Sequence, residues 1–466
     1  PGDEVVGGTV NREGVLKIRA TRVGSDTFLA HVVSLVEEAL ASKPPIQKLV
    51  DKVAGYFTFI VIAISIATFM TWSLIGAGFT RAILSSVSVL VVACPCALGL
   101  ATPTAVMVGV GKSAEYGIII KNGEALKLAS KMDVIVFDKT GTLTKGKPEV
   151  TDVIPIDVHS PEEVLKLAAI AEKNSEHPLA KAIVEEAVNK GLTLEDPQNF
   201  MSIPGRGVRA VYNGVELLVG SLSLMADEGV DCGKAEAKAV QLMKQGKTVV
   251  VISVDKRAIG IIGLMDTPRP EAKTAIDALK EMKLKIAMIT GDNERTAKAI
   301  AGQLGIDIVL ANMPPWVKAQ EIKKLQQEGL IVGMVGDGVN DAPALTQAHI
   351  GIAIGSGTDI AIEAGDIILV RDDLRDVVAA VQLSQRVVRQ IKQNLAWAFS
   401  YNIIHIPLAA AGLLYPALAG LAMALSSASV TTWSLLMKRY VPKIKRQSNP
   451  RKLPCSQANK FNCPLQ

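Results

Sequence analysis

The chain has 466 residues, with 50 Lys and Arg against 45 Asp and Glu and a formal net charge of +5. Its length excludes a single small module, its 49% hydrophobic content excludes a largely disordered chain, and its five scattered cysteines do not make a disulfide framework. The slight, evenly spread positive charge does not predict nucleic-acid binding, whereas a mean hydropathy of +0.31 requires that apolar residues gather in particular segments.

These apolar residues gather in two parts of the chain. No Asp, Glu, Lys or Arg occurs from 53 to 80 or, after Arg81, from 82 to 111. Each run exceeds the roughly 20 residues that a membrane-spanning α-helix needs. A third such stretch, 393–437, is interrupted near Gly412 and Pro416 and predicts two more helices. We therefore expect four transmembrane helices in two hairpins, because buried helices of soluble proteins rarely run this long without a charge.

Basic residues predict how these helices are oriented. Only Arg81 lies between the two helices of a hairpin, and the other basic residues flank the hairpins on the opposite side. Because basic residues accumulate on the cytoplasmic side, we expect an integral membrane protein, in the cell membrane, with its large central segment and both termini in the cytoplasm. The flanking basic residues are Lys112, Lys121, Lys127, Arg386, Arg389, Lys392, Lys438, Arg439, Lys443, Lys445 and Arg446.

The central segment, about 113–383, predicts soluble α/β structure. Three short β-branched or apolar runs, 133–137, 285–290 and 331–335, each end at aspartate or glycine. Such runs are typical of buried parallel strands, whose carboxyl ends carry the chemistry of open α/β sheets. Between the first run and the others, residues 145–265 have their own strand and helix signals, which predicts an inserted domain.

Four motifs follow these strands and indicate phosphoryl transfer. Asp138 opens the string DKTGTLT, Thr290 opens TGD, Lys318 stands alone, and residues 336–341 read GDGVND. A strand-end carboxylate followed by Thr and Gly in a turn is well placed to attack a phosphoryl group, whereas an isolated aspartate would more often cap a helix. The coincidence of all four motifs favours the catalytic interpretation.

Together the four motifs resemble the P-type ATPases of the haloacid-dehalogenase superfamily. By that resemblance Asp138 is the nucleophile that takes the γ-phosphate of ATP, and Thr140 stands where many related phosphatases carry a second aspartate as general acid and base. Without that aspartate, hydrolysis of the aspartyl phosphate slows and the intermediate can drive a conformational change. The resemblance implies catalytic roles for Lys139, Thr140, Thr290 and Lys318, contacts to ATP by Gly291 and Asp292, and Mg²⁺ binding by Asp337, Asn340 and Asp341.

The inserted segment resembles the nucleotide-binding domain of the heavy-metal branch of this family. It carries Ser175-Glu176-His177-Pro178 and, further on, Pro204-Gly205-Arg206-Gly207. By itself His177 could be a satisfied surface histidine. The resemblance implies that Glu172, His177, Gly205 and Gly207 surround the adenosine, where an imidazole can stack on a purine and glycines allow close backbone approach.

The second apolar run contains Cys94-Pro95-Cys96, a candidate ion site. Proline removes a backbone hydrogen bond and unwinds the helix locally, so two thiolates could converge near the bilayer centre. Thiolates select soft ions such as Cu(I), Ag(I) or Zn(II). Packing of two small cysteines at a helix interface is the alternative, and the intervening Pro95 argues against it.

The last two apolar helices sharpen the choice of ion. Their residues Asn394, Pro407 and Ser426, with the ligand candidates named below, resemble the Cu(I)-transporting subgroup, although Trp433 stands where that subgroup usually has asparagine. Zinc and cadmium pumps tend to have a carboxylate in the last helix, and this helix has none. The implied Cu(I) site, which would also accept Ag(I), is formed by Cys94, Cys96, Tyr401, Asn402, Met423 and Ser427.

The predicted fold is an α/β multi-domain membrane protein with a haloacid-dehalogenase-like Rossmannoid phosphorylation domain and an inserted α+β nucleotide-binding domain. Neither the TGE motif of the family's actuator domain nor the family's first four helices occur in this sequence, so we expect an N-terminally truncated member. The expected parts are an actuator remnant (1–47), the first hairpin (48–112), the phosphorylation domain (113–144 and 266–383), the nucleotide-binding domain (145–265), the second hairpin (384–440) and a tail (441–466).

The predicted function is ATP-driven export of Cu(I), and of Ag(I) if the site accepts it, through an aspartyl phosphate. Expected partners are ATP, the soft monovalent ion, the lipid bilayer and a cytosolic copper chaperone, with no nucleic acid. Two alternatives remain open at this point: a truncated relative that binds ATP and metal without turnover, and a phosphatase of the same superfamily.

Overall fold

The computed structural model describes residues 17–21, 23–24, 45–156, 158–203, 206–292, 294–337, 341–354 and 363–447. The predicted Mg²⁺ ligand Asn340, the adenosine contact Gly205 and most of the predicted actuator remnant and tail lie outside these residues. Two compact units are distinguished, Pro1–Met132 with His349–Gln466 and Asp133–Ala348, and each is described by itself.

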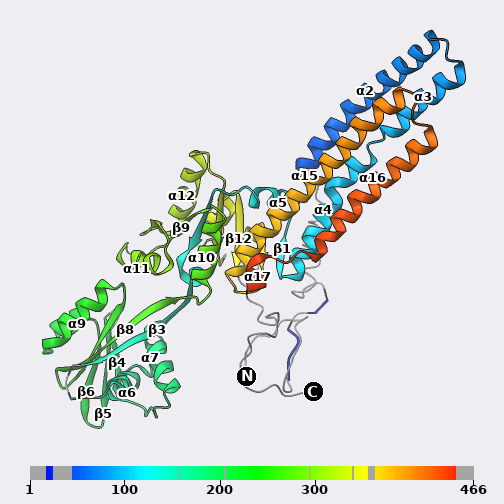
Figure 1. The fold of residues 1–466 in the computed structure, drawn as a ribbon. Helices are drawn as coiled ribbons and strands as arrows, with labels where there is room; N and C mark the ends of the chain where they lie inside the picture. The colour runs from blue at the N-terminus through cyan, green and yellow to red at the C-terminus, as the bar shows by residue number, and fades with distance from the viewer. Residues whose placement is uncertain are drawn as a thin grey trace, which may run out of the picture. The chain divides into compact units, whose positions relative to one another are not determined.

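The first unit is dominated by long, apolar helices that lie side by side (Figure 1). Among the described residues, three segments are long and apolar enough to cross a membrane: Lys52–Leu74, Phe79–Glu115 and Pro416–Arg439. The fourth expected span, after Gln393, is the second half of α15. It is less apolar than the other three described segments, because it contains Asn394, Asn402 and His405. The helices are α2 (Pro45–Leu74), α3 (Phe79–Val92), α4 (Cys96–Glu115), α15 (Arg375–Ala410) and α16 (Pro416–Leu436).

Small residues hold these helices together. Ala97 and Ala101 of α4 pack in one cluster with Ala398 of α15 and Val430 of α16. A Cβ at Gly109 of α4 would lie 2.3 Å from a methyl carbon of Val387 on α15, so only glycine permits this approach. Close contact of this kind is how helices associate in lipid, where no hydrophobic effect drives them together.

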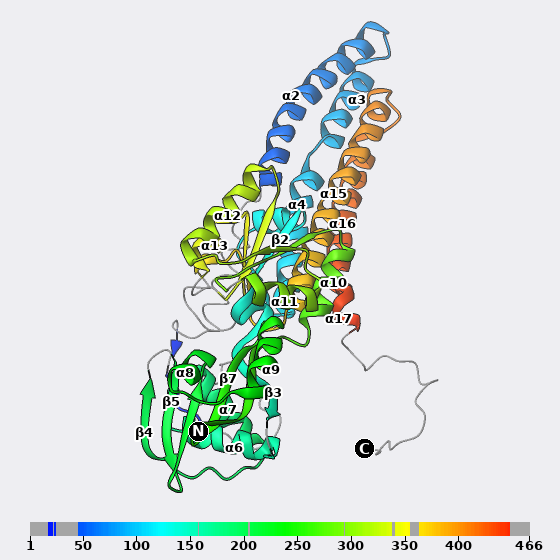
Figure 2. The same cartoon turned by 90° about the vertical axis from the view of Figure 1, so that its left-hand side faces the viewer.

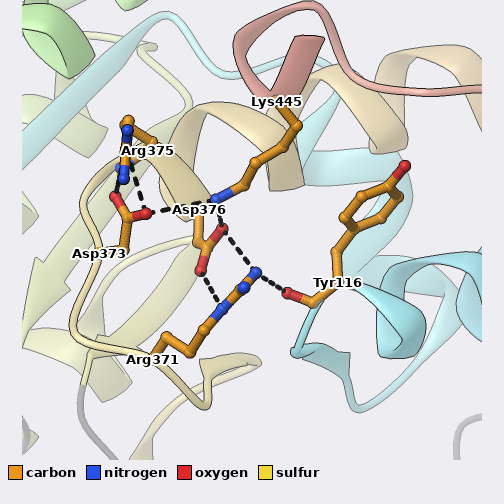
Figure 3. A network of polar contacts seen from close by, with 6 residues as sticks. All are labelled: Tyr116, Arg371, Asp373, Arg375, Asp376 and Lys445. Atoms are coloured by element: carbon orange, nitrogen blue, oxygen red, sulfur yellow. Dashed lines mark hydrogen bonds and ion pairs between the residues drawn. The ribbon is translucent and has the colours of Figure 1, made fainter. Parts of the chain in front are cut away.

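A buried carboxylate links the ends of α4 and α15 to the segment that follows α16 (Figure 3). Asp376, in the first turn of α15, is fully buried and accepts from Lys445 in the short helix α17 (Lys443–Gln447). Its other oxygen lies 3.2 Å from Arg371 Nε, and Arg371 also donates to the Tyr116 carbonyl at the end of α4, at 2.6 Å. Lys445 also lies 3.4 Å from Asp373. One ionic network thus connects α4, α15 and the segment that follows α16.

Next to this network the first unit contains a short sheet edge. β12 (Ile350–Ile354) pairs parallel with β13 (Ile367–Leu369), which pairs antiparallel with β1 (Ile118–Ile120). Helix α5 (Gly123–Ala129) follows β1, and its N-terminus is capped by the Asn122 side chain, which accepts from the Ala125 N–H at 2.7 Å.

The second unit contains the three predicted parallel strands, each within one residue of its expected position. β2 (Val134–Asp138) lies between β11 (Val332–Gly336) and β9 (Lys285–Ile289), and β10 (Ile308–Leu310) follows β9. β2 and β11 are buried throughout, as expected for apolar strands covered on both faces. The connecting helices are α10 (Ala272–Glu281), α11 (Glu294–Leu304), α12 (Pro315–Gln327) and α13 (Ala342–Gln347).

An antiparallel sheet forms the inserted part of the second unit (Figure 2). Alternate side chains of its strands point to opposite faces, and both faces are apolar and covered. Helices α6 (Pro161–Glu172) and α7 (Pro178–Asn189) cover one face, and α8 (Leu222–Asp227) and α9 (Gly233–Lys244) cover the other. The strands, in spatial order, are β3 (Thr144–Pro155), β8 (Arg257–Pro268), β7 (Thr248–Val254), β6 (Val215–Gly220), β5 (Gly207–Tyr212) and β4 (Gln198–Ile203).

Candidate functional site

The candidate nucleophile Asp138 is the last residue of β2 and is 5% exposed. The chain then turns sharply, with Thr140 in extended backbone and Gly141 at φ 77°. A side chain at Gly141 would be strained by this backbone, and its Cβ would lie 3.0 Å from Asp337 Oδ2. The glycine therefore lets the loop after Asp138 pass close to the second strand-end aspartate.

Lys318 connects the carboxylates of Asp138 and Asp341. Its Nζ atom lies 2.6 Å from an oxygen of each, and all three side chains are buried. Burial and the neighbouring Asp341 raise the pKa of Asp138 to about 7, against the opposing effect of the Lys318 ammonium. Although burial acts in the opposite direction, the two carboxylates raise the pKa of Lys318, which holds its proton. One lysine between two carboxylates leaves this centre with an excess of negative charge.

The same centre fits a magnesium ion that is completed by substrate. Asp341 Oδ2 is buried without a hydrogen-bond partner among the described residues, and Asp337 Oδ2 lies across the loop at Gly141. Among the described residues, no group of three or more His, Cys, Asp or Glu side chains could hold a metal ion by itself. Mg²⁺ is commonly bound through one or two carboxylates plus substrate phosphates, so two aspartates suit it.

The TGD motif lies at the carboxyl end of β9, the strand next to β2. Thr290 is buried, and its hydroxyl accepts from the Asp292 N–H at 3.1 Å. A Cβ added at Gly291 would lie 3.6 Å from the Met313 carbonyl oxygen. Asp292 in turn lies 2.6 Å from Lys139 Nζ, directly after the nucleophile. The structure thus brings the predicted catalytic residues of two motifs together at one edge of the sheet.

Two residues of this centre were missed by the sequence analysis. Asp266, near the end of β8, accepts from the Thr144 hydroxyl at 2.5 Å and from the Gly146 N–H at 3.0 Å. Arg269 donates to the Gly141 carbonyl at 2.8 Å and to the Thr144 carbonyl at 3.2 Å. Both hold the loop after Asp138 from the far end of the inserted segment. The charged Asp-Thr-Pro-Arg turn that ends β8 was the available signal.

Glu172 and His177 lie on consecutive helices of the inserted segment. Glu172 ends α6 and is 7% exposed, and its burial raises its pKa to about 7, against the effect of a hydrogen bond from Ser175. His177 caps α7, because its Nδ1 accepts from the Leu179 N–H at 3.2 Å. An accepting Nδ1 requires the proton of the neutral ring to be on Nε2. Capping of α7 therefore uses Nδ1 of the ring, and Nε2 is left for the expected role in nucleotide binding.

Gly207 begins β5, the strand against which α6 packs. Its φ is 154°, and a Cβ would lie 2.2 Å from the Val219 carbonyl oxygen and 2.7 Å from Gly220 Cα. No side chain fits there, so the glycine is required by the close approach of β5 and β6. This packing requirement exists whether or not a nucleotide is bound.

The Cys94-Pro95-Cys96 sequence breaks the second apolar run, as predicted. α3 ends at Val92, α4 begins at Cys96, and Pro95 precedes its first turn. The two sulfurs meet, but they are joined in a disulfide instead of standing as two thiolates. Ion binding by this pair stays a prediction, and it applies to the reduced form, in which both sulfurs are free to act as ligands.

The other ion-site candidates lie on α15 and α16 and differ in burial. Asn402 lies between Ala398 and Ile406, which pack in the clusters that contain Ala97 and Ala93 on either side of the cysteines. Both Asn402 and Met423 are buried, and Tyr401 is half-buried and stacks on His405 with ring centroids 4.0 Å apart.

The predicted ligand Ser427 is also half-buried. Its neighbour Ser426 is 2% exposed and lies on the same face as Met423, three residues before it. The Ser426 hydroxyl has no hydrogen-bond partner in the described part of the chain. By burial, Ser426 is therefore better placed than the predicted ligand Ser427.

Asn394 connects the helix that carries the cysteines to the last two helices. It is fully buried, and its Nδ2 donates to the Ala101 carbonyl of α4 at 3.0 Å and to Ser434 Oγ of α16 at 2.9 Å. Its Oδ1 accepts from Gln390 at 2.9 Å. Both amide hydrogens of Asn394 and one acceptor position of its oxygen are thus used for helix packing.

Comparison with known proteins places the chain in a family. A family model of haloacid dehalogenase-like hydrolases matches residues 132–349. A probable copper-exporting P-type ATPase of Archaeoglobus fulgidus is 53% identical over 96% of this chain and 56% of its own length, and a copper-exporting P-type ATPase of Staphylococcus saprophyticus is 49% identical over 94% and 55%. The chain thus spans about half the length of the curated relatives it matches.

Solved structures agree with the fold. The crystal structure of a zinc-transporting PIB-type ATPase in the E2.Pi state matches with a TM-score of 0.78 and 35% identity, over 89% of this chain and 68% of that one. A second crystal structure of a zinc-transporting PIB-type ATPase, in another state, matches with a TM-score of 0.72, again at 35% identity, over 89% and 67%. These matches confirm the predicted fold class. The chain belongs to the P-type ATPases, within their PIB-type branch.

Proposed function

We propose that this chain carries the catalytic and ion-binding machinery of a pump that couples ATP hydrolysis to Cu(I) export. The chain is a membrane protein, and in this family the soluble domains are cytoplasmic. One observation carries the proposal: a buried strand-end aspartate in the DKTGTLT loop, which Lys318 links to the aspartate of a second motif. The copper exporters among the relatives favour copper over zinc as cargo.

The reaction at Asp138 is a phosphoryl transfer. A carboxylate oxygen of Asp138 bonds to the γ-phosphorus of ATP while the bond to the β–γ bridging oxygen breaks, and ADP leaves with that electron pair. Lys318 and the Thr290 hydroxyl stabilise the charge on the transferred oxygens. Asp337 and Asp341, with Asn340, would hold Mg²⁺, which would neutralise further phosphate charge. Thr140 is exposed and has no carboxyl group, so it cannot assist rapid hydrolysis of the product.

The nucleotide is held by the inserted segment. We assign the adenosine to the surface between Glu172, His177 and the glycine pair Gly205 and Gly207. His177 Nε2, on the ring edge not used in capping α7, faces the nucleotide. The uncharged form of buried Glu172 both donates and accepts, which suits the donor and acceptor edge of adenine.

The transported ion binds to the reduced Cys94 and Cys96, with Tyr401, Asn402 and Met423 near the same level of the bundle. The serine ligand is the predicted Ser427 or the more deeply buried Ser426. Because thiolates and a thioether hold soft ions tightly, Ag(I) is accepted as well. An ion of this softness is best delivered by a carrier protein, so a cytosolic copper chaperone is the proposed donor.

Phosphorylation from [γ-³²P]ATP tests the catalytic proposal. The chain should acquire an acid-stable, hydroxylamine-sensitive label, and Asp138→Asn should abolish it because an amide cannot form the acyl phosphate. Asp152→Asn is the matched control, because Asp152 pairs with Lys247 within the nucleotide sheet and should keep the label. A label that persists in Asp138→Asn would overturn the assignment.

Metal competition tests the ion. The reduced chain should bind Ag(I) and Cu(I) in preference to Zn(II), and Cys94→Ser with Cys96→Ser should lose this binding while the ATP-dependent label remains. Cys232→Ser, in the nucleotide-binding part, is the control. A parent chain that prefers Zn(II) would contradict copper as cargo.

A further inference from the structure

A groove of about 520 Å³ runs along the outer face of α15 and α16, away from the ion site. Along α15 its lining residues recur every three or four positions, so they form one continuous stripe. The stripe is polar at its start and becomes apolar and aromatic. The lining residues are Arg386, Gln390, Gln393, Ala396, Trp397, Ser400, Trp433 and Leu436.

The two tryptophans form the wall of this groove. Trp397 of α15 and Trp433 of α16 have ring centroids 5.2 Å apart at an interplanar angle of 57°. They remain 39% and 42% exposed, although an aromatic pair inside the bundle would be buried. Trp433 lies three residues before the cytoplasmic end of α16, the depth at which tryptophan is enriched in membrane proteins.

Arg386 lies at the cytoplasmic end of the groove, where none of the described residues offers it a carboxylate. Its contact in this part of the chain is with Gln390 Oε1, at 3.3 Å. Gln390 is 3% exposed and donates a hydrogen bond to Asn394, which in turn donates to α4 and α16. The guanidinium is therefore held in place by buried amides.

The surroundings of Arg386 are also positive. No aspartate or glutamate follows Asp376 in the sequence, whereas basic residues flank both ends of this hairpin. Around Tyr440, just beyond α16, Arg386, Arg389 and Arg446 lie within electrostatic reach. An occupant of the groove is thus anionic where it meets Arg386 and apolar where it meets the tryptophans.

We propose that this groove is a binding site for an anionic phospholipid of the cytoplasmic leaflet. Its phosphate binds Arg386 and Gln393, and an acyl chain lies along Trp397, Trp433 and Leu436. From Arg386 to Trp397 the helix rises roughly 16 Å, at about 1.5 Å per residue, which is enough to separate a headgroup from its chain. A zwitterionic lipid such as phosphatidylcholine also brings a phosphate to Arg386, but its quaternary ammonium group is repelled by the surrounding basic residues. The net charge of the lipid therefore makes the site selective.

Quenching by brominated lipids tests the site. In the full chain with Trp72→Phe and Trp316→Phe, only the two groove tryptophans fluoresce. In phosphatidylcholine vesicles, phosphatidylglycerol with brominated acyl chains should quench them at about a fivefold lower mole fraction than brominated phosphatidylcholine, from the approximate attraction of one basic residue for anionic lipid. Arg386→Gln should remove this difference, and Lys392→Gln, an exposed basic residue of the same helix outside the groove, should keep it.

The complementary variant guards against a folding defect. Trp72 donates to the Ala410 carbonyl at 2.9 Å, so its replacement perturbs the outer end of the bundle. A chain that keeps Trp72 and Trp316 but carries Trp397→Phe and Trp433→Phe should show no preference for the anionic quencher. Equal quenching by both lipids in the parent, or a preference that survives Arg386→Gln, would overturn the proposal. Protection from both lipids would overturn it too, because it would mean that protein covers the groove.

Discussion

The proposed phosphorylation centre and the proposed ion site in the membrane helices would hold charge away from water in opposite ways. At Asp138 the buried carboxylates are stabilised by an opposite charge, since Lys318 lies 2.6 Å from Asp138 and from Asp341. Asn402 and Met423 are buried and uncharged, and the helix break at Pro95 brings two sulfurs together. The countercharge at the first site suits the proposed anionic substrate, and the neutral, polarisable groups at the second suit the proposed soft cation.

Of the variants that test this comparison, the removal of Lys318 should change stability and phosphorylation most. Lys318→Ala leaves two buried carboxylates without a countercharge, so it should lower the free energy of unfolding by about 3–5 kcal/mol and abolish phosphorylation. Thermal unfolding of the purified chain measures the loss. If charge is the cause, adding Asp341→Asn to Lys318→Ala should restore part of the stability but not the label. Equal instability of both variants would point to packing instead.

The pH dependence of stability that comes from Glu172 should be a smaller effect. This carboxyl group is buried, and none of the described residues gives it a basic partner. Its pKa is near 4.5 when the chain is unfolded and about 7 in the folded protein, so the folded state holds this proton more tightly. Stability from this group is complete below pH 4.5 and is lost as the pH rises to 7, by about 3 kcal/mol.

The difference between the parent and Glu172→Gln isolates this group. Unfolding free energies at pH 4.5, 5.5 and 7 should show the parent losing stability relative to the variant, which cannot titrate. Glu185→Gln, on the next helix, controls for the loss of one carboxylate. A constant difference across this range would contradict a raised pKa of Glu172.

Replacing either of the two adjacent serines of α16 should have the smallest effect, a change in Ag(I) affinity. These two variants test the proposed ion site. Ser426→Ala should weaken Ag(I) binding about fivefold, because it removes a buried hydroxyl whose partner would be the ion. Ser427→Ala should change it less than about twofold, because this hydroxyl is only half-buried. Titration against a competing chelator gives both affinities. The reverse ranking would restore Ser427 as the ligand and would leave Ser426 as an unpaired packing residue.

Local chemistry was predictable from the sequence, and helical phase was not. The strands that end at Asp138, Ile289 and Gly336, and the helix break at Pro95, follow from residue types that act on their own backbone. The choice between Ser426 and Ser427 depends on which side of α16 faces its neighbours, and a helix without charged residues contains little information about that.

Contacts across long sequence separations were also beyond reach. Asp266 and Arg269 hold the loop after Asp138 from more than 120 residues away, a distance that is closed only when the inserted sheet folds. Two cysteines so close in sequence could be placed at one point, but whether their sulfurs stand apart or bond to each other depends on the backbone between them.

The ionic network at Asp376 has a mechanical consequence. Because Arg371 ties the end of α4 to this carboxylate, and Lys445 ties on the segment after α16, three helices share one fixed point at their cytoplasmic ends. β13 ends only two residues before Arg371. We expect a movement of this strand to be transmitted through one ionic network to α4, which begins at Cys96, to α15 and to the segment after α16.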